Sequence, residues 1–235
     1  MKIRSLLSLM CLAGILVVGC QTKDSENAPS GGDTNASGNT PTAEAPKDLE
    51  VPKELMSDAY EYYGLSRREP IKMKVTANGT ESAATQTVSI SAVEKDHVLF
   101  LLKNEGGLQQ LGDVTAKLDK EGVKIIAMNG AKLEKESMEL PVGLTPGKKW
   151  PFILPTPNLK LSGTNTVTGT SKVTTSVGTY NDAILVTSSA SGEQNGKKVQ
   201  LTSKQWLVKG RGQVKAEITS TEGGKKSTVV MEETK

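Results

Sequence analysis

Short stretches in which apolar and polar residues alternate follow one another from residue 71 to the end of the chain. Alternation with a period of two places successive side chains on opposite faces of a β-strand, so most stretches predict a strand with one buried face. Val98–Leu102 is apolar throughout, which predicts a strand buried on both faces. The predicted strands are Ile71–Thr76, Val88–Ala92, Val98–Leu102, Val114–Leu118, Val123–Met128, Leu159–Thr170, Ser171–Val177, Ala183–Ala190, Lys198–Val208, Gln213–Thr221 and Ser227–Glu233.

Turn-forming residues separate these stretches. Asn78-Gly79, Asn129-Gly130 and pairs of glycines are typical of tight hairpins, and residues 104–107, Asn-Glu-Gly-Gly, predict a further turn. About ten or eleven strands joined by short turns predict an all-β fold, an antiparallel meander. So many strands curl rather than stay flat, so we expect a half-barrel or an open β-barrel.

A short N-terminal helix is the one helical element that the pattern predicts. Pro52 suits a first helical turn, and Leu55, Met56, Ala59 and Tyr63 recur at helical spacing before Glu69-Pro70 stops the helix. Residues 51–235, about 185 in number, then form one β-rich domain. A chain of this length buries about 70% of its unfolded surface and needs no second domain.

The first twenty residues do not follow the strand pattern. Lys2 and Arg4 precede the apolar run Leu6–Val18. This run of about 13 residues suits a signal peptide, whose core has about 7–15, and is shorter than the about 20 of a membrane-spanning helix. The motif Val17-Val18-Gly19-Cys20 resembles the lipobox of bacterial lipoproteins. The resemblance implies a signal peptide over residues 1–19 and lipid attachment at Cys20. The alternative is an ordinary secretory signal with Cys20 near the cut.

The lipoprotein interpretation implies how the mature chain is held. Cys11 would leave with the signal and the lipid would occupy Cys20, so neither a disulfide nor a thiolate nucleophile is expected. Residues 21–50 are rich in Ser, Thr, Asn, Gly, Pro and acids, which predicts a disordered tether about 30 Å in end-to-end distance. The expected location is the cell envelope, with the membrane as partner through the lipid. Gln21 after the cysteine resembles an outer-membrane address, if the organism has an outer membrane.

Charge and aromatic content exclude one class of partner. The net charge is +3 at pH 7, and the excess of five positive charges over residues 51–235 is spread along the chain. A mild, dispersed excess is typical of a solvated surface. The eight aromatic residues are not interleaved with basic residues as stacking platforms, so nucleic-acid binding is not predicted.

Three segments of the C-terminal half carry a second resemblance. Leu140–Trp150 places Gly-x-x-Trp before a strand, Val177–Val186 begins with a Gly-Thr-Tyr turn, and Lys204–Lys215 joins Trp206 to Gly-x-Gly-x-Val-Lys. These segments resemble an uncharacterised family of bacterial envelope proteins with curved antiparallel sheets. Tyr62-Tyr63-Gly64-Leu65 matches only half of the family's usual opening, because no tryptophan follows. The resemblance implies a fold and brings neither catalytic residues nor a cofactor.

Candidate chemistry is sparse. His97 is the sole histidine, and a zinc site needs three or four ligands, so we interpret it as a turn residue. Gly143–Lys149 departs from a phosphate-binding loop in spacing, and a Pro-Gly turn is the simpler interpretation. Lys209–Gly212 reads as a hairpin with solvated basic residues. The acid pairs Glu134/Glu136 and Glu232/Glu233 could serve as acid and base, but glutamates among lysines usually form a solvated face.

Aromatic residues leave two functions open. Six of them are expected either to fill the core or to line a pocket for an apolar ligand: Tyr60, Tyr62, Tyr63, Trp150, Phe152 and Trp206. The sequence predicts a lipid-anchored, non-catalytic envelope protein that acts as an interaction module for another envelope protein or the cell wall. The alternative is a carrier or receptor for an apolar ligand, such as a lipid acyl chain, inside the curved sheet. No enzyme, metal site or cofactor is predicted.

Overall fold

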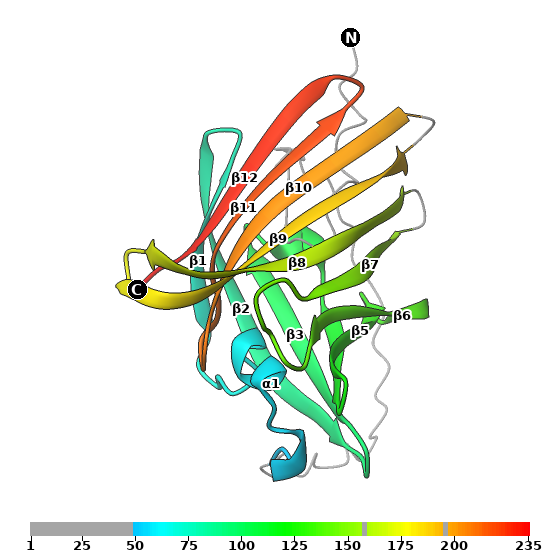
Figure 1. Ribbon diagram of the computed structural model, residues 1–235, viewed down its shortest axis with the longest axis vertical. Helices are drawn as coiled ribbons and strands as arrows, with labels where there is room; N and C mark the ends of the chain where they lie inside the picture. Colours follow the sequence, from blue (N-terminus) through cyan, green and yellow to red (C-terminus); the bar gives the residue numbers. More distant parts are fainter. Residues whose placement is uncertain (1–48, 157–158, 195–196) are drawn as a thin grey trace, which may run out of the picture.

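The computed structural model describes residues 49–156, 159–194 and 197–235, and these form one curved sheet of twelve strands with very little helix (Figure 1). Cys20, the predicted signal peptide and nearly all of the predicted tether lie outside the described residues. The short helical elements are η1 (Lys53–Leu55), α1 (Asp58–Tyr63) and η2 (Gln109–Leu111). The strands are β1 (Ile71–Ala77), β2 (Thr80–Val93), β3 (Val98–Gly106), β4 (Val114–Asp119), β5 (Gly122–Met128), β6 (Ala131–Pro141), β7 (Lys149–Thr156), β8 (Leu159–Thr174), β9 (Thr179–Gln194), β10 (Lys197–Val208), β11 (Gly212–Glu222) and β12 (Lys225–Glu233).

The predicted all-β antiparallel meander is confirmed. The strand order is β6-β5-β4-β3-β2-β1-β12-β11-β10-β9-β8-β7, so each pair of strands adjacent in the sequence is hydrogen-bonded except β6 and β7. Pairing of β1 with β12 joins the first strand to the last. The two edges of the sheet are therefore consecutive strands, and the fold is a barrel that stays open along one seam.

The seam between β6 and β7 is bridged by side chains instead of a backbone ladder. The Ser137 hydroxyl donates to the Ile153 carbonyl at 3.2 Å, and the Trp150 indole N–H donates to the Glu139 carbonyl at 3.2 Å. Backbone groups alternate in direction along a strand, so the nitrogens of Pro151 and Pro155 face the same side as the Ile153 carbonyl. Proline has no N–H to donate, which accounts for an edge at β7.

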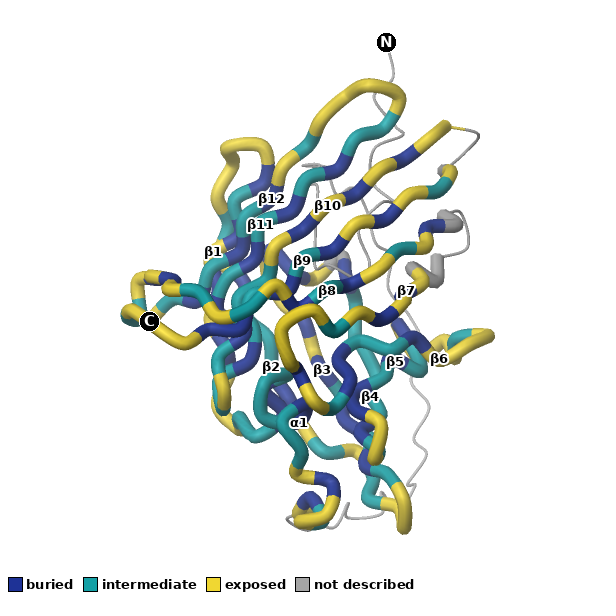
Figure 2. Tube along the Cα trace, in the orientation of Figure 1, coloured by how far each residue is buried: buried dark blue, intermediate teal, exposed yellow. Residues whose placement is uncertain are grey.

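The core follows the alternation that the sequence predicts. Buried and half-buried residues alternate along β11 as far as Thr221, and Figure 2 shows the same alternation along its neighbours. Phe100, Leu118 and Ile218 are among the largest fully buried side chains. The Tyr60 ring of α1 packs at 6.5 Å from the Phe100 ring, which attaches the helix to the core.

Helix α1 connects the two halves of the sheet, because it contacts β5 and β6 as well as β10 and β11. Ser57 caps its start by accepting from the Tyr60 N–H at 3.4 Å. It ends at Gly64, whose φ of +82° suits glycine, and a Cβ there would lie 3.0 Å from the Arg211 carbonyl oxygen. The Asp58 carboxylate accepts from the N–H groups of Gly143 and Leu144 at 2.9–3.0 Å. The helix is therefore attached to the loop that precedes β7.

Several details of the predicted elements were wrong. The helix ends at Gly64 instead of Glu69, because the left-handed glycine terminates it. Leu159–Thr170 and Ser171–Val177 are not two strands: β8 continues to Thr174, and two bulges in its pairing with β9 break the alternation. β6 was not among the predicted strands, because its acids and lysines mask the pattern.

The prediction for β3 also needs correction. Buried positions alternate with half-buried ones over Val98–Leu102, so one face packs in the core and the other is partly open. The strand runs on to Gly106 through the predicted turn at residues 104–107. Asn104 is buried within this extension. Its side chain is hydrogen-bonded to the Gln86 amide and the Gly112 carbonyl, and these bonds replace the water that burial removes.

Candidate functional site

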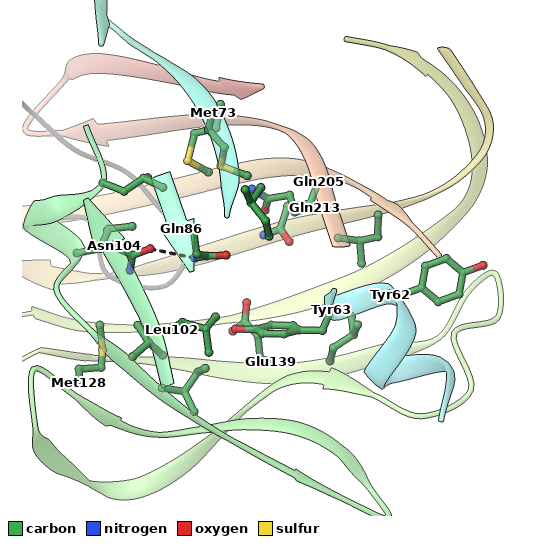
Figure 3. A pocket seen from close by; sticks show the side chains of 18 residues that line it. Tyr62, Tyr63, Met73, Gln86, Leu102, Asn104, Met128, Glu139, Gln205 and Gln213 are labelled. Carbon is green, nitrogen blue, oxygen red and sulfur yellow. Dashed lines mark hydrogen bonds between the residues drawn. The ribbon is translucent and has the colours of Figure 1, made fainter. Parts of the chain in front are cut away.

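A cavity of about 140 Å³ lies between α1 and the concave face of the sheet (Figure 3). Most of its wall is aliphatic or thioether, and its polar members come from α1 and from five different strands. The lining residues are Tyr62, Tyr63, Ile71, Met73, Gln86, Leu102, Asn104, Leu108, Leu111, Val114, Ile125, Met128, Glu139, Leu140, Gln205, Leu207, Gln213 and Met231. Such a wall, apolar with a few polar groups, is typical of a small-molecule site.

The strand period places the apolar part of the wall. Ile71 and Met73 of β1 are two residues apart and so point to the same face, and both are buried. Met73, Met128 and Met231 contribute three flexible thioethers from three strands. Methionine adapts its shape to the group against it, so this wall suits an apolar guest of variable shape.

One polar pair in the wall is already satisfied. The Gln86 side-chain amide donates to the Asn104 side-chain carbonyl at 2.9 Å, and the Asn104 amide donates to the Gly112 carbonyl at 2.7 Å. Figure 3 shows this pair joined across β2 and β3. These groups rigidify their part of the wall and leave little hydrogen-bonding capacity for a ligand.

Glu139 of β6 is the acidic residue of the wall. Its side chain is half-buried because it meets the cavity, while protein encloses its other sides. No side chain or backbone donor among the described residues is hydrogen-bonded to its carboxyl group. Burial raises the pKa of Glu139 from its ordinary 4.5 to about 8, because the charged form loses hydration without gaining a partner.

Tyr63 of α1 lies beside this carboxyl group (Figure 3). Burial raises the pKa of Tyr63 well above its ordinary 10, and the nearby Glu139 charge raises it further. The tyrosine hydroxyl therefore stays protonated and can both donate and accept a hydrogen bond. Glu139 and Tyr63 together form a polar wall in a mostly apolar cavity.

A bulge turns Glu139 into the cavity. In a regular strand, successive side chains point to opposite faces, yet Glu139 and Leu140 both line the cavity. The register of β5 and β6 shifts here, since Val123 pairs with Leu140 and Lys124 pairs with Met138. The residue left over is Glu139, and re-aiming a side chain is a recognised effect of a bulge.

Sequence reasoning missed Glu139, because the local pattern contains no signal for it. The acid stands between Met138 and Leu140, where a strand of strict alternation would place it on the solvent face. Gln205, Leu207 and Gln213 reach the cavity beside another register shift, between Trp206 and Leu207. Neither shift has a local sequence signature, because each results from pairing between strands.

The sequence-predicted candidates for metal binding or catalysis that the structure describes lie outside this cavity. Cys20 lies outside the described residues. His97 lies in the β2–β3 turn, where its ring nitrogen is 2.7 Å from the Asp96 carboxylate. This hydrogen bond lowers the pKa of Asp96. In the part of the chain that the structure describes, no three His, Cys, Asp or Glu side chains come together as a metal site would require.

The two glycine-containing loops form turns. Residues 143–149 make a Pro-Gly turn before β7, as predicted, with Gly147 at a φ of +88°. Asp58 occupies the Gly143 and Leu144 N–H groups, which a phosphate would otherwise need. Residues 209–212 form the β10–β11 turn, but the prediction that their basic side chains are all solvated was wrong. Arg211 binds Glu233 through two hydrogen bonds, at 2.7 and 3.3 Å.

The predicted solvated acid pairs differ from each other. Glu134 and Glu136 are exposed on β6, and Glu136 pairs with Lys117. Glu233 is 1% exposed, which corrects that interpretation for the second pair. Arg67 and Arg211 each approach its carboxylate to 2.7 Å, and the Tyr180 hydroxyl lies at 3.4 Å. This network joins the end of β12 to two loops and to the start of β9, and it explains how the charge is buried.

The six aromatic residues do not form one cluster. Tyr60, Trp150 and Phe152 belong to the main core, whereas Trp206 packs against a separate small group around Val173, Ala183 and Val214. Tyr62 and Tyr63 line the cavity. Three of the aromatic residues therefore fill the core, and two line the cavity.

Comparisons with known proteins give distant structural matches. The sequence matches no known family, and no curated protein matches it. A Bacteroides fragilis protein that is described as exported with a YmcC-like fold has a TM-score of 0.49 and 11% identity, covering 74% of this chain and 97% of its own. A Parabacteroides distasonis protein that is described as a lipoprotein has a TM-score of 0.46 and 13% identity, with the same coverage. At these values the likeness carries no conclusion about a ligand.

None of the helices in the described ranges is long and apolar enough to cross a membrane.

Proposed function

We propose that this protein binds a small apolar ligand in the cavity between α1 and the curved sheet. The observation that carries the proposal is the cavity itself, with aliphatic and thioether walls drawn from seven strands and a restricted set of polar groups. An engineered apolar cavity of about 150 Å³ binds benzene, so a space of about 140 Å³ suits one ring or the end of a short chain.

The cavity favours a ligand carrier or receptor over the interaction module that the sequence also predicts. No specific feature of the described outer sheet surface supports an interaction module. Protein interiors are close-packed, so a cavity of this size is unexpected unless it has a use. The apolar occupant is a whole small molecule or one end of a larger one. A complete lipid acyl chain exceeds this volume unless α1 moves.

We also propose that the protein is exported and anchored to the envelope through lipid on Cys20. The support is the lipobox-like motif Val17-Val18-Gly19-Cys20 after the short apolar run. Two acyl chains give stable anchoring, whereas one is marginal. Membrane fractionation of cells that produce the full chain tests this, with Cys20→Ala as the variant. The anchor is refuted if that variant stays in the membrane fraction as completely as the parent protein.

Titration with benzyl alcohol, followed by isothermal calorimetry and by amide chemical shifts, tests ligand binding. We expect saturable binding with the largest shifts at the lining residues. Leu102→Phe narrows the cavity and should weaken binding at least tenfold, while Ile153→Phe changes an exposed position on β7 and should leave it unchanged. Equal affinity in both variants would place the binding elsewhere. Absence of saturable binding by both benzyl alcohol and toluene would refute the proposed function.

A further inference from the structure

The lining of the cavity includes one acidic side chain and no basic side chain. Glu139 and the hydroxyls of Tyr62 and Tyr63 are its titratable groups, and no Lys, Arg or His occurs among the described residues of the wall. The side-chain amides of Gln205 and Gln213, in the same lining, also have no hydrogen bond to a described residue. A ligand that entered would thus meet several free acceptors and one acid, with no cation to neutralise it.

We propose that the ligand of this cavity is an apolar amine whose ammonium group pairs with the Glu139 carboxylate. This proposal rests on the proposed function and adds the chemical class of the ligand. The apolar body lies against the Met73, Met128 and Leu102 side of the wall, and the ammonium group lies at the Glu139 side. The ammonium group would give a partner to an acidic group that has none among the described residues.

The hydrogen-bonding inventory matches an ammonium group. A primary ammonium has three donors, and the Glu139 carboxylate, the Tyr63 hydroxyl oxygen and the side-chain carbonyls of Gln205 and Gln213 are acceptors in the same wall. A charged pair inside a protein is favourable when its remaining hydrogen bonds are also satisfied, which these groups allow.

A carboxylate ligand is disfavoured by the same geometry. Its charge would approach Glu139 with no lysine or arginine of the described wall to balance the two acids. A neutral alcohol of the same size keeps the apolar contacts but forgoes the charge-assisted bond. The expected order of affinity is therefore amine, then alcohol, then carboxylate.

Three probes of nearly one size test this order: benzylamine, benzyl alcohol and benzoate, titrated by calorimetry into the full-length protein. The titrations are run at about pH 8.5, above the Glu139 pKa of about 8, so that the carboxylate form predominates. We expect benzylamine to bind about tenfold more tightly than benzyl alcohol, because charge-assisted hydrogen bonds are about twice as strong as neutral ones. Benzoate should bind more weakly than both.

Glu139→Gln supplies the decisive variant, because it keeps the size of the side chain and removes its charge. It should abolish the preference for benzylamine while benzyl alcohol affinity changes less than about threefold. Glu134→Gln, an exposed acid on the same strand, is the matched control and should retain the full preference. Benzyl alcohol binding in the Glu139→Gln protein shows at the same time that the variant is folded.

The experiments distinguish failure of the amine proposal from failure of the proposed apolar-ligand site. If benzyl alcohol binds to the wild-type protein and benzylamine binds no more tightly, the amine proposal is overturned and the apolar site stands. A preference for benzylamine that survives Glu139→Gln also overturns it, since the charge would then lie elsewhere. If neither probe nor toluene binds, the proposed function itself is wrong.

Discussion

Replacing Glu139 by glutamine should change how the stability of the protein depends on pH. In the folded protein, burial raises the pKa of this carboxyl group from its ordinary 4.5 to about 8. The folded state therefore holds a proton that the unfolded state releases across this range. Stability falls with rising pH wherever the folded state binds more protons, so Glu139 destabilises the protein progressively between about pH 4.5 and pH 8. Glu139→Gln removes this part of the profile.

The size of the effect follows from the same pKa. Each tenfold change in proton affinity corresponds to about 1.4 kcal/mol, so the full difference between 4.5 and about 8 would correspond to about 5 kcal/mol. A cavity of about 140 Å³ with polar walls can hold water, which screens the charge. We therefore expect the variant to gain about 2–3 kcal/mol in free energy of unfolding, relative to the wild type, between pH 5 and pH 9.

Urea denaturation of the unliganded domain, followed by circular dichroism at pH 5, 7 and 9, measures the free energy of unfolding. Glu134→Gln is the control, because its side chain is exposed on the same strand and should follow the wild-type profile. Burial keeps Tyr63 protonated over this range, so the neighbouring tyrosine adds no slope of its own. Parallel profiles for Glu139→Gln and wild type, within about 0.5 kcal/mol, would show that Glu139 is hydrated and would refute the reasoning.

Three further substitutions test how the sheet is held together, each measured as free energy of unfolding in urea. Glu233→Gln should cost about 2–3 kcal/mol, because it leaves the partly exposed Arg67 and Arg211 without their shared anion; a change below about 0.5 kcal/mol would contradict the buried network. Phe100→Ala should cost about 3–5 kcal/mol, since the ring is fully buried, and a smaller loss would show that the core around α1 collapses into the space. Ser137→Ala should cost about 1 kcal/mol and speed amide exchange in β7; unchanged exchange there would mean that the seam does not depend on this hydrogen bond.

Local regularities made much of the fold predictable. Asn78-Gly79 is a two-residue hairpin turn with φ of +49° and +87°, as its sequence predicts, because few other residue pairs adopt two positive φ values cheaply. The alternation of β11 reports its buried face directly, since the side-chain period of a strand is two. Strand β6 escaped prediction because solvent-facing acids and lysines outnumber its core residues.

The candidate site was far less predictable than the fold. Tyr62 and Tyr63 were among six aromatic residues that the sequence assigned either to the core or to a pocket, and the structure places these two at the cavity. Glu139 was not, because an acid between Met138 and Leu140 reads as a solvent-facing residue. The direction of its side chain depends on a bulge against β5, which no local property of β6 encodes.

By itself, the sequence determined that this chain is a curled antiparallel meander and where most of its turns fall. Those properties follow from the period of side chains along a strand and from the few residues that tolerate tight turns, and both are local. The tertiary structure alone decided that β1 pairs with β12, that the seam stays open between β6 and β7, and that Glu233 is buried between two arginines. It also turned Glu139 into a cavity. Each of these depends on contacts between residues far apart in the chain, whose energies no short window of sequence contains.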